Sequence, residues 1–573
     1  MLELKDIYFS IEKDDEEVHL IDDATLKIHP GHFMAIVGPS GCGKTTLLKV
    51  IAGLNVESKG NLYWNGRDLS EEGDLEPSEI GYVPQFSIAY ELLTVEESIR
   101  GAIRLRVRTR GRAAFHDLLE KVMEDTGLTA IRGRPVRVLS GGQRRRLSLA
   151  LELVTNPVLL LCDEVTSGLD PKSEQEVVKL LHKLSRESGR IVINVTHSLA
   201  NLDLYDSVLV LHEGKVVYHG QPRALEHYFS VTIAEDVYPR LAKRESDDWA
   251  QSWKKHRANY YEALDSAAQV APQKNEGVPV DGTITLSAAM PGFFVQFLTL
   301  LFRRWKLFLR DGGQLFLQIA ILIGFPVLVV IFALDGIEPI KSLSESIAAN
   351  PIEEANQQAD IFKNHLKTGG LISGLIMFQV ILLTLMASNN SAREIAGERQ
   401  IYEKERFGGL NPLSYLASKV AFLGVLVVVQ SFWMAIFVQN ICHLPTANFS
   451  MHLALLLAVN AAMTAICLGI SAMSKSAEQS SLLSVYLVGF QLPLSGAVLA
   501  LPSFAEWLSR PFISAYWAWS GGVSSLDSKT LGAVDSVIDT SLQASWLCLL
   551  VLTIHFAVGM FAAYVGVKKN RCL

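Results

Sequence analysis

The apolar residues of this chain follow two patterns, and the change between them lies near residue 290. Before that point, short apolar runs alternate with charged stretches of helical periodicity, which is typical of an α/β domain. The runs predicted as strands are 33–37, 158–162, 191–195 and 208–211. Residues 230–290 are polar and mixed, and we interpret them as a linker with some helix and little core.

After residue 290, long apolar runs with few charges take over. A helix needs about 20 apolar residues to cross a bilayer, and six runs reach roughly that length. They lie near 315–334, 369–389, 415–439, 451–473, 480–501 and 545–567. The sequence therefore predicts an α/β domain at 1–229, the linker at 230–290, and an all-α membrane domain of six helices at 291–573.

The orientation of the spans follows from the distribution of Lys and Arg. The first residues, MLELKDIYFS, do not resemble a signal peptide, so we expect the first domain to stay in the cytosol. Six spans then return the C-terminus to the same side. The segments placed inside are the basic ones, as the positive-inside rule requires: they carry Arg303, Arg304, Lys306, Arg310, Arg393, Arg399, Lys404, Arg406, Lys475, Lys568, Lys569 and Arg571.

Composition agrees with this division. The 573 residues are too many for one core. Only 19% of them are charged, against about 25% in soluble proteins. The net charge of −7 gives no reason to expect a nucleic-acid partner. The six cysteines show no metal-ligand spacing, and Cys42 and Cys162 fall inside motifs of the first domain, which favours a reducing cytosol for that half.

The strongest local motif is GPSGCGKT, residues 38–45, directly after a predicted strand. It matches the P-loop pattern G-x-x-x-x-G-K-[ST]. The glycines let the backbone wrap a phosphate, while backbone N–H groups and the next helix N-terminus attract the anion. Lys44 is expected to reach the β and γ phosphates of ATP, and Thr45 to bind Mg²⁺. The nucleotide-binding residues of this motif are Gly38, Ser40, Gly41, Gly43, Lys44, Thr45 and Thr46.

Two further motifs supply groups that phosphoryl transfer needs. VLLLCDE, residues 158–164, is an apolar strand that ends in two carboxylates. Asp163 is suited to the Mg²⁺ shell and Glu164 to polarising the attacking water. LSGGQ, residues 139–143, places Ser140 and Gly142 where a helix should begin, which makes a second anion-binding helix terminus.

In this order the motifs resemble the ATP-binding cassette family, and the resemblance implies further roles. Ser140 and Gly142 look like the family signature, which contacts the γ-phosphate held by another subunit. Gln85, in GYVPQ, matches the Q-loop, which senses Mg²⁺ and the membrane domain. Asp170, in TSGLD, matches the D-loop, and His197, in INVTH, matches the histidine that holds the γ-phosphate.

The chain departs from the family pattern at three points. Val165 stands where the family usually has proline, and Cys162 where it usually has leucine; neither change removes a catalytic group. The aromatic residue that stacks on adenine aligns near Ile11, which cannot stack. Tyr8 and Phe9 are the substitutes nearby, so adenine recognition stays open.

The order of domains resembles the G subfamily of half-transporters, the white-type and sterol or multidrug proteins. One cassette and six spans per chain then imply a dimer, with a homodimer as the default and a heterodimer as the alternative. The loop 398–419 resembles that subfamily's cytosolic loop, and 302–311 an amphipathic connecting helix. Carried over from its substrate cavity, Met386 and Val498 are expected to line or plug a cavity.

Two segments predicted to lie outside, 335–368 and 502–542, depart from the subfamily. The first is long and acidic, and the second lacks the cysteines that animal members carry. These features favour a bacterial inner membrane. The function that the resemblance implies is ATP-driven export or flipping of a hydrophobic substrate, a lipid or a drug-like compound.

Three other functions were weighed. An importer is disfavoured because bacterial importers usually keep the two domains on separate chains. Six spans exclude a soluble ABC protein acting on ribosomes or DNA. A membrane ATPase that only transmits force would show uncoupled hydrolysis with no transported species. The identity of the substrate and the direction of transport, beyond the resemblance, are not encoded in any motif.

Overall fold

The computed structural model describes residues 1–13, 16–73, 75–270, 290–334, 351–498 and 501–569. These residues form two compact units. The cassette unit contains the described residues up to Thr299 together with Gln400–Leu410, and the membrane unit contains those of Leu300–Arg399 and from Asn411 onward. The first division between the units follows Thr299, whereas the sequence predicts a change near residue 290, and a short piece from the second half of the chain belongs to the first unit.

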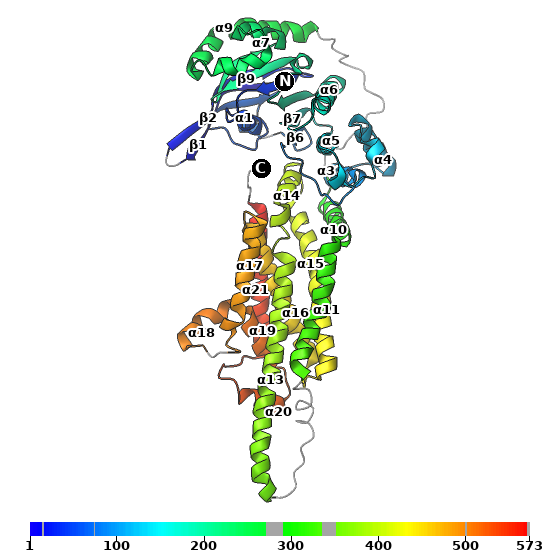
Figure 1. Ribbon diagram of the computed structural model, residues 1–573, viewed down its shortest axis with the longest axis vertical. Coiled ribbons are helices and arrows are strands. Elements are labelled where there is room, and N and C mark those ends of the chain that lie inside the picture. The colour runs from blue at the N-terminus through cyan, green and yellow to red at the C-terminus, as the bar shows by residue number, and fades with distance from the viewer. Residues whose placement is uncertain (14–15, 74, 271–289, 335–350, 499–500, 570–573) are drawn as a thin grey trace. The chain divides into compact units, whose positions relative to one another are not determined.

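A six-stranded sheet forms the centre of the cassette unit, in the order β10-β9-β3-β8-β7-β6 (Figure 1). All neighbours are parallel except β9 and β10. Its central strands are buried along their full length, as strands covered on both faces should be. The strands are β3 (Phe33–Val37), β6 (Ile80–Val83), β7 (Leu159–Asp163), β8 (Ile191–Val195), β9 (Ser207–His212) and β10 (Lys215–Gly220).

A second, antiparallel sheet packs on the same core. It has the order β2-β1-β4-β5, and its apolar residues join the large core cluster of the central sheet. The strands are β1 (Leu2–Lys13), β2 (Glu16–Ile28), β4 (Lys59–Trp64) and β5 (Arg67–Asp68). Helices α1 (Lys44–Ile51) and α6 (Pro171–Ser188) follow β3 and β7 and cover the central sheet.

Three helices form a smaller subdomain with a core of its own. They are α3 (Val95–Arg106), α4 (Arg112–Asp125) and α5 (Gly141–Leu153). Both α3 and α5 begin with a complete capping box, Thr94 with Glu97 and Ser140 with Gln143. A capping box satisfies two of the free N–H groups at a helix start, so these boundaries are fixed by local sequence.

Much of the predicted linker is part of the cassette unit. Within it, α9 (Ser246–Val270) lies beside β10, and α8 (Val237–Leu241) packs on α7 (Pro222–Phe229), the helix before the predicted linker (Figure 1). Trp249 and Trp253 on α9 are buried against the main core. The expectation of little core was wrong here, because two tryptophans on one helical face bury more apolar area than the polar average of the segment suggests. Residues 271–289 of the linker lie outside the described residues.

An inserted segment, Gln400–Leu410, is held in the cassette unit by a buried group of charges. Glu152 on α5 is 1% exposed and accepts a hydrogen bond of 2.8 Å from Arg106 Nη1 on α3. Lys404 Nζ, on α14 (Arg399–Phe407), lies 3.2 Å from the same carboxylate. Burial alone would raise the pKa of Glu152, but Arg106 and Lys404 outweigh it and hold the pKa below its usual range.

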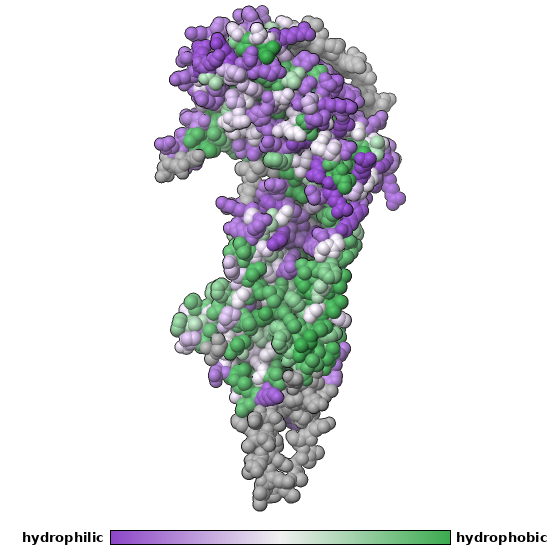
Figure 2. Space-filling model, in the orientation of Figure 1, coloured by the Kyte–Doolittle hydropathy of each residue, from purple (hydrophilic) through white to green (hydrophobic). Residues whose placement is uncertain are grey.

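The membrane unit contains five helices that are long and apolar enough to cross a bilayer, counted among the described residues. Figure 2 shows the apolar side chains that these helices expose. The spans found are Gly312–Ala333, Leu366–Phe407, Pro412–Cys442, Phe449–Met473 and Ser545–Lys568. They correspond to α11 (Gly312–Ala333), α13 (Pro351–Ser391) with its continuation, α15 (Pro412–Cys442), α16 (Phe449–Met473) and α21 (Ser545–Lys568).

The predicted span 480–501 is shorter than expected. Its helix, α17 (Ala477–Gln491), has 15 residues and gives way to a 3-10 turn at Pro493–Ser495. A proline cannot continue the hydrogen-bond ladder of a helix, and the chain turns at this point. Short helices α18 (Ser503–Ser509), α19 (Ser514–Val523) and α20 (Ser528–Asp535) follow within the predicted external loop. Of the acidic segment 335–368, residues 335–350 lie outside the described residues, and the rest is the start of α13.

Polar side chains inside the membrane unit are paired with one another. Gln318, Asn390 and Gln430, from three different spans, form a closed ring of amide hydrogen bonds of 2.7 to 3.3 Å. Glu394 accepts two hydrogen bonds from Arg304, at 2.6 and 2.9 Å, and a third from Lys419 at 3.1 Å. Such pairing is expected where no water can compensate a polar group.

Two spans pack with their backbones in near contact. A Cβ added at Gly559 on α21 would lie 2.5 Å from the backbone of Ala465 on α16, and one at Gly566 would lie 2.7 Å from Ala472. Small residues at these positions let the two helices approach closely, which is the main source of helix association in lipid.

Acid should destabilise the cassette through two buried histidines. Burial lowers the pKa of His32 to about 4 and that of His219 to about 3, whereas an unfolded histidine titrates near 6.5. Between these values only the unfolded chain binds the protons, so stability is lost as pH falls from about 6.5 toward 4. At pH 5 we expect a loss of about 2 kcal/mol per histidine.

The measurement is the thermal unfolding midpoint of the cassette in the full chain between pH 7.5 and 5. In the variant His219→Asn the fall of the midpoint with pH should become shallower. The control His116→Asn replaces an exposed histidine and should leave the slope unchanged. An equal slope in all three proteins would contradict the prediction.

Glu152→Gln should weaken the attachment of the inserted segment. It leaves Arg106 and Lys404 buried without a counter-charge, and breaking a buried pair in this way typically costs about 3 kcal/mol. We expect a lower unfolding midpoint and faster proteolysis near residue 404. The matched control is Glu187→Gln, because Glu187 pairs with Lys183 on an exposed surface and its loss should cost well under 1 kcal/mol.

Candidate functional site

The P-loop, residues 38–45, is shaped by glycines with backbone angles that other residues avoid. Gly43 has φ 99° and caps α1 without any side-chain hydrogen bond. A Cβ there would lie 2.5 Å from the Leu20 carbonyl, and one at Gly38 would lie 2.3 Å from the Leu211 carbonyl. The loop therefore fits only without side chains at these positions, and the first N–H groups of α1 stay available for an anion.

Lys44 folds back over this loop. Its Nζ donates to the carbonyls of Gly38 and Pro39, at 2.9 and 2.8 Å. Lys44 as a whole is 5% exposed, so its amine is held inside the loop. A phosphate in the loop would offer charged acceptors in place of the two carbonyls, which form stronger hydrogen bonds.

A carboxylate and a hydroxyl meet beside the P-loop. Thr45 Oγ1 donates to Asp163 Oδ1 at 2.9 Å, and Tyr82 donates to the other oxygen at 3.2 Å. Burial raises the pKa of Asp163, while these two hydrogen bonds act to lower it. Hydroxyl and carboxylate oxygens are the ligands that Mg²⁺ takes in proteins, so this pair fits the ion.

Glu164 lies between two of the other predicted residues. Its Oε1 is 2.5 Å from His197 Nε2, and its Oε2 accepts a hydrogen bond of 2.7 Å from Gln85 Nε2. The residue has φ 48°, a left-handed conformation that is rare outside glycine and asparagine. Because β7 ends at Asp163 and β8 at Val195, the two parallel strands bring Glu164 and His197 to the same edge of the sheet.

The signature and the D-loop both begin helices. Ser140 is exposed and caps α5, and its hydrogen bonds stay within that first turn. Asp170 caps α6 by accepting from the N–H groups of Lys172 and Ser173, and the hydrogen bonds from Ser173 lower its pKa. Gly142 lies against Ser173, where an added Cβ would be 3.4 Å from the Ser173 Cβ. The two motifs are therefore neighbours in one chain.

Two residues of the site were missed in the sequence. Tyr82 precedes the Q-loop and binds Asp163. Arg145, three residues after Gly142, donates to the carbonyls of Gln85 and Ser167 and so links α5 to the Q-loop. The only sequence signal for Arg145 is its place in the run Arg144–Arg146, where nothing separates the arginine that reaches the Q-loop from its two neighbours.

The expected adenine position carries aliphatic side chains. Ile11 faces Val18 across the β1–β2 hairpin, and the two are 39% and 37% exposed. Leu20, two residues on from Val18, provides the carbonyl that lies over Gly43, which places this strand next to the P-loop. Of the substitutes considered, Phe9 packs against the cassette core, and Tyr8 pairs with Lys59 of β4.

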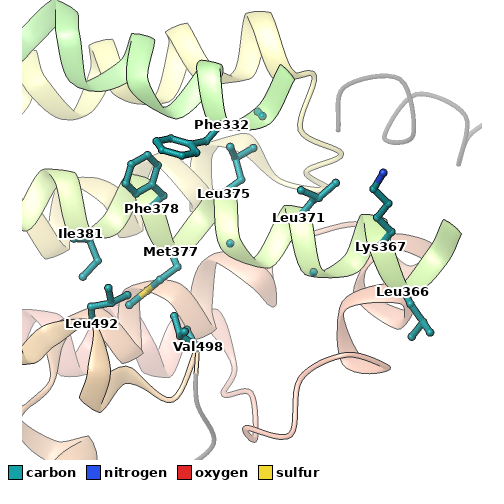
Figure 3. A pocket seen from close by; sticks show the side chains of 14 residues that line it. Phe332, Leu366, Lys367, Leu371, Leu375, Met377, Phe378, Ile381, Leu492 and Val498 are labelled. Carbon is teal, nitrogen blue, oxygen red and sulfur yellow. The ribbon is translucent and has the colours of Figure 1, made fainter. Parts of the chain in front are cut away.

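The membrane unit holds an apolar pocket of about 720 Å³ (Figure 3). Val498 lines it and is 66% exposed. Met386 does not: it is 1% exposed and packs in the core of the unit. The lining residues are Phe332, Ala333, Leu366, Lys367, Gly370, Leu371, Gly374, Leu375, Met377, Phe378, Ile381, Leu492, Ala497 and Val498.

Comparison with known proteins finds a matching family model in each unit. Residues 21–167 match the model described as "ABC transporter", and residues 295–517 match "ABC-2 type transporter". An ABC transporter ATP-binding/permease protein of Mycobacterium tuberculosis is 30% identical over 532 residues, which cover 90% of this chain and 56% of the relative. The chain therefore spans little more than half of that relative's length.

Two further similarities concern the cassette. A white-brown complex homolog protein of Arabidopsis thaliana is 35% identical over 234 residues, 39% of this chain and 21% of that protein. A solved ATP-binding cassette dimer, in a post-hydrolysis state with ADP and phosphate, matches with 27% identity and a TM-score of 0.36, over 39% of this chain and 99% of that one.

An aromatic residue at position 11 should strengthen nucleotide binding. Stacking of a base on an aromatic ring contributes about 1–3 kcal/mol, which the aliphatic Ile11 cannot supply. For Ile11→Tyr we expect the KM for ATP to fall about fivefold or more with kcat little changed. Initial rates of hydrolysis against ATP concentration give both constants.

The control for this substitution is Ile233→Tyr, at an exposed position after α7. It should leave both constants unchanged. If Ile11→Tyr has the same KM as the unchanged chain, the base does not lie on the β1–β2 hairpin.

Proposed function

Because the chain joins an ATP-binding cassette of the ABC transporter family to an ABC-2 type membrane domain, we propose that it is an ATP-driven exporter or flippase of a hydrophobic substrate, working as a dimer. The observation that carries the proposal is the contact of Glu164 with both His197 and Gln85, beside a P-loop whose Thr45 meets Asp163. The groups expected to bind Mg²⁺ and to activate the attacking water therefore lie together in one half-site.

Each residue has a role that its position allows. The P-loop N–H groups and Lys44 hold the β and γ phosphates, while Thr45 and Asp163 hold Mg²⁺, which neutralises charge on the phosphates. Glu164 Oε1 or Oε2 accepts the proton of the attacking water once its hydrogen-bond partners turn toward the nucleotide. His197 Nε2, now on Glu164, is then free to donate to the γ-phosphate.

The signature supports a dimer. Ser140 is exposed and the N–H groups at the start of α5 are capped only within their own turn. In the family that the motifs resemble, this turn completes the site held by another subunit, and one chain has one signature. A homodimer closes two equivalent sites by two-fold symmetry, and a heterodimer with a related half-transporter is the other outcome of the test.

The membrane unit supports an apolar substrate and a bacterial plasma membrane with the cassette in the cytosol. The pocket is lined almost entirely by apolar side chains, and its volume lies in the range of small-molecule sites. Arg304 precedes the first span, and Lys419 lies near the start of α15, on the side that the positive-inside rule predicts to be cytosolic. The order of domains supports the white-type subfamily.

The test is Mg-ATP hydrolysis by the chain reconstituted in lipid vesicles, together with movement of fluorescent lipids between leaflets. Glu164→Gln should bind ATP but hydrolyse it at least about a hundredfold more slowly, because it removes the base. Glu187→Gln on the exposed surface is the matched control and should hydrolyse ATP normally.

Three results would contradict parts of the proposal. Equal hydrolysis by wild type and Glu164→Gln would exclude Glu164 as the base. Hydrolysis without movement of any lipid or hydrophobic compound would favour an ATPase that only transmits force. No hydrolysis in any lipid would exclude the homodimer and point to a partner half-transporter.

A further inference from the structure

The pocket of the membrane unit has one charged residue on its wall. Of its 14 lining residues, Lys367 alone carries a polar side chain. Figure 3 shows Lys367 at one end of the row of α13 side chains and Ile381 at the other, with Phe332 and Phe378 packed together between them. The 14 helical steps from Lys367 to Ile381 correspond to about 21 Å of helix, so the pocket is long, apolar and charged at one end only.

Lys367 has no counter-ion in the part of the chain that the structure describes. It is exposed, and none of the ion pairs found there includes it. Two other basic residues of the membrane unit differ from it, because Arg304 and Lys419 both bind Glu394. A cation left unpaired at the rim of an apolar cavity is a site for an anion that arrives attached to an apolar body.

The lysine lies at the start of a span. The apolar stretch of α13 begins at Leu366, so the ammonium reaches the interface between hydrocarbon and water while the pocket runs along the helix into the span. A lysine at such a position can also serve only to anchor the helix at the interface. The two roles differ in one respect: an anchor does not distinguish charged from neutral ligands in the pocket.

We propose that the pocket takes an anionic amphiphile, with its acidic headgroup at Lys367 Nζ and its acyl chain along α13 from Leu371 to Ile381. This assignment rests on the proposed function, and it narrows the hydrophobic substrate to lipids or lipid-like compounds that carry an acidic headgroup. Neutral amphiphiles of the same chain length bind more weakly because the ammonium gains no partner.

Two photoreactive probes test the binding site directly. They are a diazirine derivative of palmitic acid and the same derivative of palmityl alcohol, which differ only in headgroup charge. The full chain is reconstituted in phosphatidylcholine nanodiscs, illuminated with each probe, and digested for mass spectrometry. We expect the acid to label residues 366–381 at concentrations about tenfold lower than the alcohol.

Three variants identify the cause of that preference. Lys367→Gln should remove it by weakening labelling with the acid only, and Lys367→Arg should keep it. Gly374→Leu should reduce labelling with both probes, because nothing lies within 4 Å of a Cβ at Gly374 and the added side chain occupies the pocket. Equal labelling by acid and alcohol in wild type, or an unchanged preference in Lys367→Gln, would overturn the proposal and leave Lys367 as an anchor.

A parallel assay separates this proposal from the transport function on which it rests. ATP hydrolysis by the same preparations is measured with palmitate and with palmityl alcohol. Acid-selective labelling with no acid-selective stimulation would confirm the site but refute transport of this ligand. Unselective labelling with normal hydrolysis would refute the site and leave the ATPase assignment intact.

Discussion

Three parallel strands at the centre of the cassette, β3, β8 and β7, run in register, and the placement of the predicted catalytic groups Lys44, Glu164 and His197 depends on this alignment. Parallel strands end at the same edge of a sheet, so the loops that follow them meet there. The P-loop follows β3, Asp163 and Glu164 end β7, and His197 follows β8. The contacts of Thr45 with Asp163 and of Glu164 with His197 are consequences of strand order, because no local sequence links residues more than 30 positions apart.

The inserted segment 400–410 shows how part of the second half of the chain becomes part of the cassette unit. Lys404 shares the buried carboxylate of Glu152 with Arg106, and Phe407 packs at the edge of the Tyr82 ring. Tyr82 in turn binds Asp163, and Arg145 holds the Q-loop backbone. A continuous set of contacts therefore runs from the inserted segment to the proposed Mg²⁺ ligand. A change in Glu152 should disturb this set of contacts, because Arg106 and Lys404 cannot stay buried without their counter-charge.

The membrane unit is subject to a different constraint, because polar groups within a bilayer have no water to bind and need partners inside the protein. The amide ring of Gln318, Asn390 and Gln430 and the ion pairs of Glu394 satisfy each other across spans. Small residues at Gly559 and Gly566 let α16 and α21 come into backbone contact. Lys367 differs from Arg304 and Lys419 in having no counter-ion among the described residues, and it identifies the end of the apolar pocket where a ligand's charge would lie.

The sequence by itself determined the parts of this protein that depend on local chemistry. The P-loop glycines, the helix start at Ser140, and the apolar runs of five spans follow from spacing and residue type, and they were predicted close to where they lie. Tertiary structure alone decided the rest, because it depends on contacts between distant residues. Examples are the burial of Trp249 and Trp253 in a segment that looked like a linker, the break before Pro493 that shortens the predicted fifth span, and the burial of Met386 while Val498 lines the pocket.

The pairing of Glu152 with Lys404 across 252 positions is the clearest case. In the sequence, either residue alone looks like an ordinary charged surface residue. Only the fold removes both from water, and each charge then becomes necessary to the other.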